Sequence, residues 1–246
     1  MPELYLSPSV QEYNPYVIGG SEEYYMNLVA DAMEPYLVSS GIRFTRNDPD
    51  QTVGAAIRQS NAGNYGLHLA LHSNAAPASL AGRLQGTDVY YYTGSTEGRR
   101  AAEIIAENFK NIYPDPAKVR TVATSQLVEV VRTRAPAVLI EIAYHDNVED
   151  ATWIRDNINA IARNLSQSVA EYFGVPFVEA TPPRRGRVTA QGALNIRSRP
   201  SLFAEVLTEV PYGGELIVNG RWEDWYVVNA NGVIGYAYAP YVALEA

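Results

Sequence analysis

Three side chains of this sequence could together support hydrolysis around a metal ion: Glu23, His72 and Glu141. Glu23 lies in the first turn of an expected helix, where a carboxylate also complements the positive end of the helix dipole. His72 ends the strand-like run LHLALH, at the edge where open α/β sheets bind ligands. Glu141 lies inside an apolar strand, where an unpaired carboxylate costs several kcal/mol. It therefore needs either a structural partner, such as Arg132 or Arg134, or a function.

The three residues predict the chemistry of a hydrolytic zinc centre. His68 cannot join His72 at one ion, because four residues of strand separate them by about 13 Å. We expect His68 to be a packed, hydrogen-bonded histidine. Two of the three side chains would then be zinc ligands, and a carboxylate would be the base that takes a proton from water. Catalytic zinc needs three protein ligands and one open position, so one ligand is missing from this set.

The elements that position these residues alternate up to about residue 177. Strand-like apolar runs are LYL, IRFTR, GLHLALH, DVYYY and AVLIEIAY. Between them, residues 22–37, 95–113 and 150–173 have the spacing of amphipathic helices, and Ser21 can cap the first. Strands that alternate with helices predict an α/β domain, with a mainly parallel sheet flanked by helices.

The chain changes character after residue 177. Residues 178–186 belong to the stretch PFVEATPPRRG, whose prolines and polar residues predict a linker. Residues 187–246 contain short apolar runs separated by glycine and proline, a pattern typical of a small all-β barrel. The sequence therefore predicts two domains, 1–177 and 187–246.

Composition excludes several classes of function. The net charge of −8 argues against nucleic acid as a partner, because phosphate binding depends on clustered Lys and Arg. The chain has no cysteine, which excludes disulfides, thiolate metal sites and cysteine nucleophiles. No apolar stretch approaches the roughly 20 residues of a membrane helix, and the start MPELYLSPS is unlike a signal peptide. We therefore expect no membrane insertion, and either cytoplasmic synthesis with later release or a signal that this sequence does not include.

Four segments of the first domain match a known family in the family's own order. They are EEYYMN, FTRND, IRQSNAGNYGLHLALHSNA and RAPAVLIEIAYHDNVEDA. The domain resembles the zinc-dependent N-acetylmuramoyl-L-alanine amidases of the amidase-3 type, which are found in bacterial autolysins and phage endolysins. The resemblance implies that Glu23 and His72 bind zinc and that Glu141 is catalytic. We also expect Asn74 and His145, which follow the two site strands, to contact substrate.

The sequence departs from the family at the first zinc ligand. The family usually has a DPGHGG-like turn whose histidine binds zinc, whereas this chain has SPSVQE, with Val10 at the histidine's place. Glu12 is the preferred replacement because it lies nearest in the turn. Gln11 and Tyr13 would be poorer donors, and His145 could swing in from another loop. Otherwise the site binds metal weakly or not at all, which would leave an amidase fold that binds peptidoglycan without cutting it.

The second domain resembles the bacterial Src-homology-3-like domains attached to cell-wall hydrolases. The matching segments are ALNIRSRPS, the pair Gly213 and Gly214, DWYVV and GVIGYAYAPYVAL. The resemblance implies binding to peptidoglycan peptides through aromatic side chains, which add contact area at small entropic cost. The aromatic candidates are Trp222, Trp225, Tyr236, Tyr238 and Tyr241, of which Trp225 is expected in the core.

Taken together, these patterns predict a peptidoglycan amidase with a zinc cofactor that acts at the bacterial cell wall. A glycosidase that uses two carboxylates is a further alternative.

Overall fold

The computed structural model describes residues 2–245. Residues 3–33 and 44–173 form one compact unit, which contains the six-stranded sheet and is called the N-terminal domain below. The second unit contains residues 34–43 and the chain from residue 174 onward. Its strands, from residue 184 onward, are called the C-terminal domain. No helix of the described chain has the length and apolar character needed to cross a membrane.

The N-terminal domain is built on a six-stranded sheet of order β2-β1-β3-β6-β4-β5. The strands are β1 (Glu3–Pro8), β2 (Arg43–Arg46), β3 (Leu67–Asn74), β4 (Thr87–Tyr92), β5 (Val119–Thr124) and β6 (Ala137–Tyr144). Strand β3 runs parallel to β1 and β6, and β4 runs parallel to β5. Only β4 and β6 pair in the antiparallel sense among these contacts. The predicted mainly parallel sheet is confirmed.

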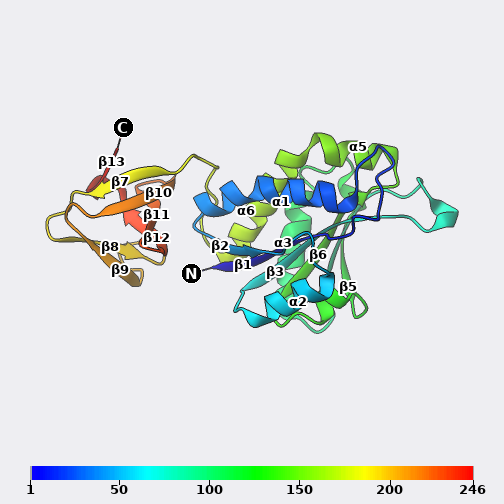
Figure 1. Cartoon of the computed structure of the whole chain (residues 1–246), viewed down its shortest axis with the longest axis horizontal. Coiled ribbons are helices and arrows are strands. Elements are labelled where there is room, and N and C mark those ends of the chain that lie inside the picture. The colour runs from blue at the N-terminus through cyan, green and yellow to red at the C-terminus, as the bar shows by residue number, and fades with distance from the viewer. Residues whose placement is uncertain (1, 246) are drawn as a thin grey trace. The chain divides into compact units, whose positions relative to one another are not determined.

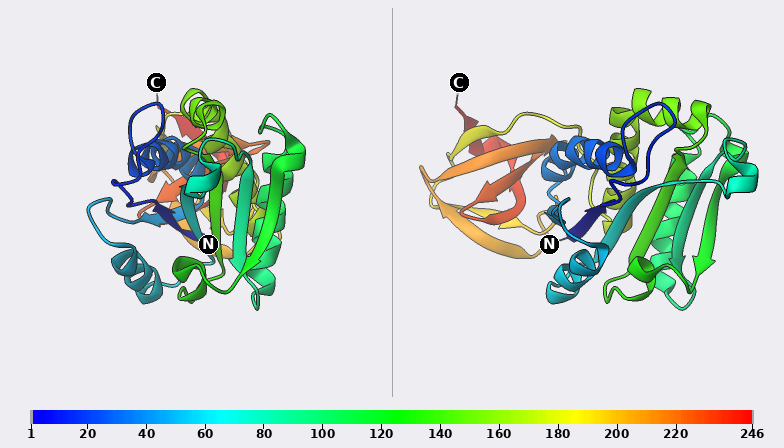
Figure 2. Two further views of the ribbon diagram at one scale, coloured as in Figure 1. Left: turned by 90° about the vertical axis from the view of Figure 1, so that its right-hand side faces the viewer. Right: turned by 45° about the vertical axis from the view of Figure 1, so that its right-hand side comes forward.

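Helices cover both faces of this sheet. They are α1 (Glu22–Ser39), α2 (Val53–Ala62), α3 (Thr96–Phe109), α4 (Val128–Val131), α5 (Val148–Asp156) and α6 (Ile158–Phe173). Figures 1 and 2 show α1 and α2 on opposite sides of β1 and β3. Helix α3 packs on α6 and on strands β4 to β6, while α4 packs on β4 and β6.

The burial of α1 shows why its sequence folds as a helix. Met26, Val29, Met33 and Leu37 recur at helical spacing and are all fully buried. The hydroxyl of Ser21 accepts the backbone N–H of Tyr24, which caps the helix as predicted. The first turn of α1 is therefore fixed by both a cap and an apolar face.

The C-terminal domain is an antiparallel sheet of order β13-β7-β10-β11-β12-β8-β9. Its strands are β7 (Arg184–Val188), β8 (Ala193–Arg197), β9 (Val206–Pro211), β10 (Glu215–Trp222), β11 (Trp225–Ala230), β12 (Val233–Tyr238) and β13 (Val242–Leu244). A core that includes Val188, Ile196 and Val228 fills its interior. The predicted small all-β domain is confirmed, and β7 begins inside the segment expected to be a linker.

Candidate functional site

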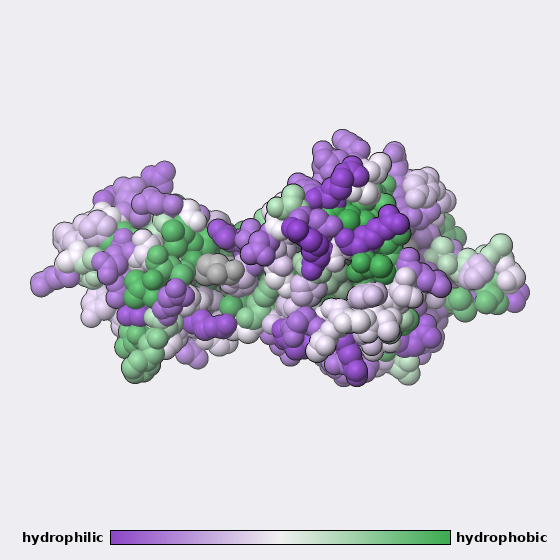
Figure 3. All heavy atoms as spheres, turned by 90° about the horizontal axis from the view of Figure 1, so that it is seen from below, coloured by the Kyte–Doolittle hydropathy of each residue, from purple (hydrophilic) through white to green (hydrophobic). Residues whose placement is uncertain are grey.

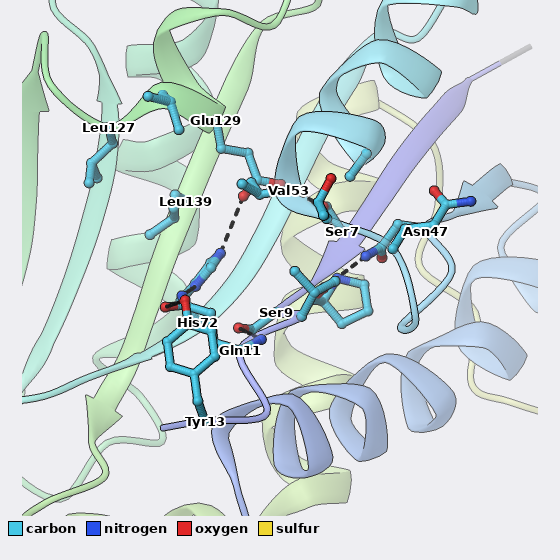
Figure 4. A pocket seen from close by; sticks show the side chains of 16 residues that line it. Ser7, Ser9, Gln11, Tyr13, Asn47, Val53, His72, Leu127, Glu129 and Leu139 are labelled. Carbon is cyan, nitrogen blue, oxygen red and sulfur yellow. Dashed lines mark hydrogen bonds and ion pairs between the residues drawn. The ribbon is translucent and has the colours of Figure 1, made fainter. Parts of the chain in front are cut away.

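His72 is the centre of the polar site, at the carboxyl end of β3. Its Nδ1 lies 2.8 Å from Oε1 of Glu22, and its Nε2 lies 3.3 Å from Oε2 of Glu129 (Figure 4). Burial alone would lower the pKa of His72. Hydrogen bonds to Glu129 and Glu22 outweigh burial and raise this pKa well above its ordinary value. The two carboxylates therefore favour the protonated form of the imidazole.

Glu22, not the predicted Glu23, is the α1 carboxylate that reaches His72. Glu22 is only 1% exposed and also accepts a hydrogen bond from Asn14 Nδ2 at 2.7 Å. Glu23 is one position farther along the helix and so points about 100° away around its axis. The Glu23 carboxylate accepts instead from Asn27 Nδ2 at 3.0 Å. The structure thus brings Glu22 to His72, and zinc binding by Glu23 stays a prediction.

Gln11 occupies the third position beside His72 and Glu22. Its Nε2 lies 3.2 Å from His72 Nδ1 and 3.4 Å from Glu22 Oε1. His72 Nδ1 and Glu22 Oε1 are 2.8 Å apart, so the three atoms form a triangle, called the donor triangle below. Its sides are close to the spacing of about 3.3 Å between ligands of tetrahedral zinc with bonds of about 2.0 Å. Gln11 Oε1 accepts from Tyr13 and Asn14, so a rotation of the amide would be needed to present oxygen to the triangle.

The other candidates for a third ligand lie outside the triangle. Glu12, the residue preferred from the sequence, is exposed. Burial is the main cause that raises the pKa of Glu23, and the negative charge of Glu12 raises it further. Tyr13 is 77% exposed and holds the Gln11 amide. His145 is buried, with Nδ1 donating to the Ser73 carbonyl at 2.9 Å. His145 is therefore tied to the end of β3, and its contact with substrate stays a prediction.

The chemistry of the triangle fits a zinc ion with two strong ligands and one weak one. A carboxylate and an imidazole are ordinary zinc ligands, and a neutral amide is a poorer donor. Among residues 2–245, no three His, Asp or Glu side chains are grouped so that they could hold a metal. A carboxylate on the second ring nitrogen, as Glu129 provides for His72, is usual for metal-binding histidines.

Glu141 lies next to His72 in the sheet and is partly buried. In the backbone register of the sheet, Glu141 lies opposite His72 of β3 and opposite Asp88 of β4. Within the described chain its Oε2 is buried without a hydrogen-bond partner. Arg134, one of the expected partners, binds the backbone of Asn61 instead. The structural explanation for Glu141 therefore loses support.

The surroundings of Glu141 raise the pKa of its carboxyl group into the neutral range. Burial raises the pKa of Glu141 to about 7, and the charges of Glu22 and Asp88 add to this, while His72 opposes it. A general base works best when its pKa lies near the working pH. Glu141 is thus suited to take a proton from a water molecule beside His72.

A cavity of about 400 Å³ opens next to His72. One wall is apolar, with Leu127, Leu139 and Val53, while His72 and Gln11 contribute polar groups (Figure 4). A substrate in this cavity would therefore meet an apolar surface beside the polar site. Asn74, the other expected substrate residue, lies half-buried at the end of β3.

Glu129 is the site residue that the sequence analysis missed. It lies on α4, whose four residues are too few to show helical periodicity. The signal that could have found it is a carboxylate inside the apolar run LVEVV, the same kind of signal that identified Glu141.

The predicted wall-binding aromatics of the C-terminal domain lie in different places. Tyr236 is 1% exposed and belongs to the core, so it cannot contact peptidoglycan as expected. Trp222 is 38% exposed and lines one cavity, while Tyr238 lines another together with Trp225 and Tyr241. The expected core position of Trp225 is confirmed by its burial.

Comparison with known proteins places both domains in families. Residues 14–171, more than half of the chain, match the family described as N-acetylmuramoyl-L-alanine amidase, and residues 192–243 match the bacterial SH3 domain. No curated protein matches the chain.

Solved structures of amidases share the fold of the N-terminal domain at low sequence identity. The amidase AmiC2 of Nostoc punctiforme is 15% identical, with a TM-score of 0.62 over 70% of this chain and 97% of that chain. The catalytic domain of the amidase CwlV from Bacillus (Paenibacillus) polymyxa var. colistinus is 15% identical, with a TM-score of 0.60 over 72% and 100%. The catalytic domain of the CD27L endolysin, which targets Clostridia difficile, is 19% identical, with a TM-score of 0.57 over 70% and 98%. The chain therefore belongs to the N-acetylmuramoyl-L-alanine amidase family and carries a bacterial SH3 domain after its amidase domain.

Proposed function

We propose that the protein hydrolyses the amide bond between N-acetylmuramic acid and L-alanine in peptidoglycan, with Glu141 as the general base. The observation that carries this proposal is the Glu141 carboxylate, which lies opposite His72 in the sheet and has one buried oxygen without a hydrogen-bond partner. Glu22, His72 and Gln11 would hold the zinc ion. When bound, zinc polarises a carbonyl and lowers the pKa of a coordinated water.

The side chains divide the remaining work. Glu141 takes the proton of the attacking water and later returns a proton to the departing alanine nitrogen. Its pKa of about 7 suits both transfers. Leu127 and Leu139 give the adjoining cavity an apolar wall, which limits water around the reacting amide.

An end-group assay on purified bacterial walls tests the proposal. The protein with added zinc should release new L-alanine amino termini and reduce the turbidity of the walls, and a chelator should stop both. Release of reducing sugar ends would select a glycosidase instead. Wall binding by folded protein without any new end groups would support the non-catalytic alternative.

Because Gln11 is a weak ligand, a stronger donor at this position should increase the affinity for zinc. Gln11→His should tighten zinc binding on the order of 100-fold, because an imidazole replaces a neutral amide at one of the ligand positions. Competition with a chromophoric zinc chelator measures the change.

Glu12→His is the matched control for Gln11→His, since it adds the same imidazole one residue away on an exposed position. We expect the zinc affinity of this variant to stay at the wild-type value. An equal gain from Glu12→His would show that Gln11 is not the third corner.

We propose that the C-terminal domain holds the enzyme on peptidoglycan, which raises the local concentration of substrate bonds. A cavity of about 600 Å³ is lined by Trp225, Tyr238 and Tyr241 together with the polar Asn195 and Arg197. The ring centroids of Trp225 and Tyr238 are 5.4 Å apart, and those of Tyr238 and Tyr241 are 5.9 Å apart. Hydrophobic surface lies among hydrophilic groups on this domain, at the left of Figure 3.

Tyr241 is the most accessible aromatic of this cavity, at 48% exposed. Tyr241→Ala should weaken co-sedimentation with insoluble walls about fivefold or more, as loss of an aromatic contact residue commonly does. Trp222→Ala is the control, because Trp222 is also exposed but lines a separate cavity. Loss of sedimentation in the Trp222 variant alone would move the binding surface to that other cavity.

A further inference from the structure

A buried hydrogen-bond network lies behind His72, at the ring nitrogen that does not face the donor triangle. Glu129 Oε2 accepts from His72 Nε2 at 3.3 Å, and Glu129 Oε1 accepts from His68 Nε2 at 3.0 Å. The hydroxyl of Ser7 also donates to Oε1, and His68 Nδ1 lies 3.0 Å from the hydroxyl of Ser60. All five residues are buried. The predicted role of His68 as a packed, hydrogen-bonded histidine is confirmed.

The network joins four elements of the N-terminal domain. Ser7 comes from β1, both histidines from β3, Ser60 from α2 and Glu129 from α4. His68 and His72 are too far apart along the strand to share a metal ion, yet the two oxygens of one carboxylate bridge their rings. A carboxylate with three surrounding donors remains ionised.

A histidine binds metal through one ring nitrogen, and the hydrogen bond of the other nitrogen decides which one is available. In this chain the Nε2 of His72 lies 3.3 Å from Oε2 of Glu129. Its Nδ1 faces Glu22 at 2.8 Å and Gln11 at 3.2 Å. Both neighbours of Nδ1 are corners of the donor triangle, whereas Nε2 points away from it.

We propose that Glu129 is a positioning residue, which holds the Nε2 proton of His72 and thereby makes Nδ1 the metal-binding nitrogen. The carboxylate cannot be replaced by an amide without cost. Gln at this position has one acceptor oxygen and one NH₂ group, and the NH₂ group would face donors from Ser7, His68 or His72. This inference rests on the proposed zinc site, but it concerns metal binding and is measured without substrate.

Nuclear magnetic resonance of the histidine rings tests the proposal directly. The chain has three histidines, so selective ¹⁵N labelling gives only three rings to assign. On addition of zinc to the full-length protein, the Nδ1 signal of His72 should move to a metal-bound position while Nε2 keeps its proton. Zinc on Nε2, or no zinc binding at His72, would overturn the proposal. This measurement uses the wild-type chain and does not depend on the folding of a variant.

Glu129→Gln supplies a second measurement. Its zinc affinity in chelator competition should fall by about 10- to 100-fold, the usual effect of removing a carboxylate that supports a metal-binding histidine. Ser7→Ala is the matched control, because Ser7 touches the Oε1 of Glu129 and leaves the Oε2 contact with His72 intact. We expect Ser7→Ala to bind zinc like the wild type. An equal loss of zinc affinity in both variants would show that Glu129 acts only through packing of the domain, and would refute the positioning role.

The two measurements separate this inference from the proposed function. Zinc on Nδ1 without hydrolysis of walls would sustain the role of Glu129 and reject the amidase activity. Hydrolysis of walls with zinc on Nε2 would sustain the amidase activity and reject the role of Glu129.

Discussion

Glu141→Gln is expected to abolish wall hydrolysis and at the same time to stabilise the metal-free protein at neutral pH. Removal of a general base costs about 10²- to 10⁴-fold in rate. Burial raises the pKa of Glu141 from 4.5 to about 7, since the folded protein disfavours its charged form. The variant carries a neutral amide of nearly the same shape, so this penalty disappears.

The sign of the stability effect follows from the raised pKa of Glu141. Below pH 4.5 the carboxyl is neutral in both the folded and the unfolded chain and carries no penalty. As the pH rises to about 7, the unfolded chain loses its proton first, so the free energy of unfolding decreases. Above pH 7 the full penalty remains, and a pKa difference of about 2.5 corresponds to about 3 kcal/mol as an upper value.

Urea unfolding with a chelator present, at pH 5 and pH 8, measures this effect. Glu141→Gln should exceed the wild type in stability at pH 8 and approach it at pH 5. Glu103→Gln serves as the control, because Glu103 is an exposed helical glutamate whose removal should leave the pH dependence unchanged. Equal stability of wild type and Glu141→Gln at pH 8 would mean that Glu141 is not desolvated in the folded chain.

The strands that carry the site were predictable because they are buried on both faces. AVLIEIAY became β6 with the predicted bounds, Ala137–Tyr144, since a continuous apolar run has few other ways to be buried. Strand β5 was not predicted because it lies at the sheet edge, where the exposed Arg120 and Thr121 interrupt its apolar run. Helices α2 and α4 were also missed, and the predicted helix 150–173 is two helices that meet at Asn157.

The site was predictable where strands position it and unpredictable where turns do. His72 and Glu141 lie next to each other because β3 and β6 pair in parallel. The choice between Gln11 and Glu12 depends on the conformation of a turn, in which Tyr13 and Asn14 hold the Gln11 amide in place. No spacing rule in the sequence expresses that conformation.

The sequence also does not decide which of two adjacent glutamates in the first turn of α1, Glu22 or Glu23, binds zinc. A pair of variants distinguishes them. Glu22→Gln should weaken zinc binding on the order of 100-fold and remove most of the hydrolysis, because it takes away a charged ligand next to His72. Glu23→Gln should retain wild-type zinc affinity, since the Glu23 carboxylate contacts Asn27 and lies outside the triangle. Chelator competition and the amino-terminus assay measure both variants.

Each of these variants is the control for the other, because they make the same chemical change one residue apart on the same helix. The family resemblance implies Glu23, whereas the hydrogen bond to His72 in the folded chain favours Glu22. Loss of zinc in the Glu23 variant alone would therefore mean that α1 turns by about 100° at its first turn when metal binds. Loss in the Glu22 variant alone would establish that the buried carboxylate beside His72 is the ligand, in place of the Glu23 that the resemblance implies.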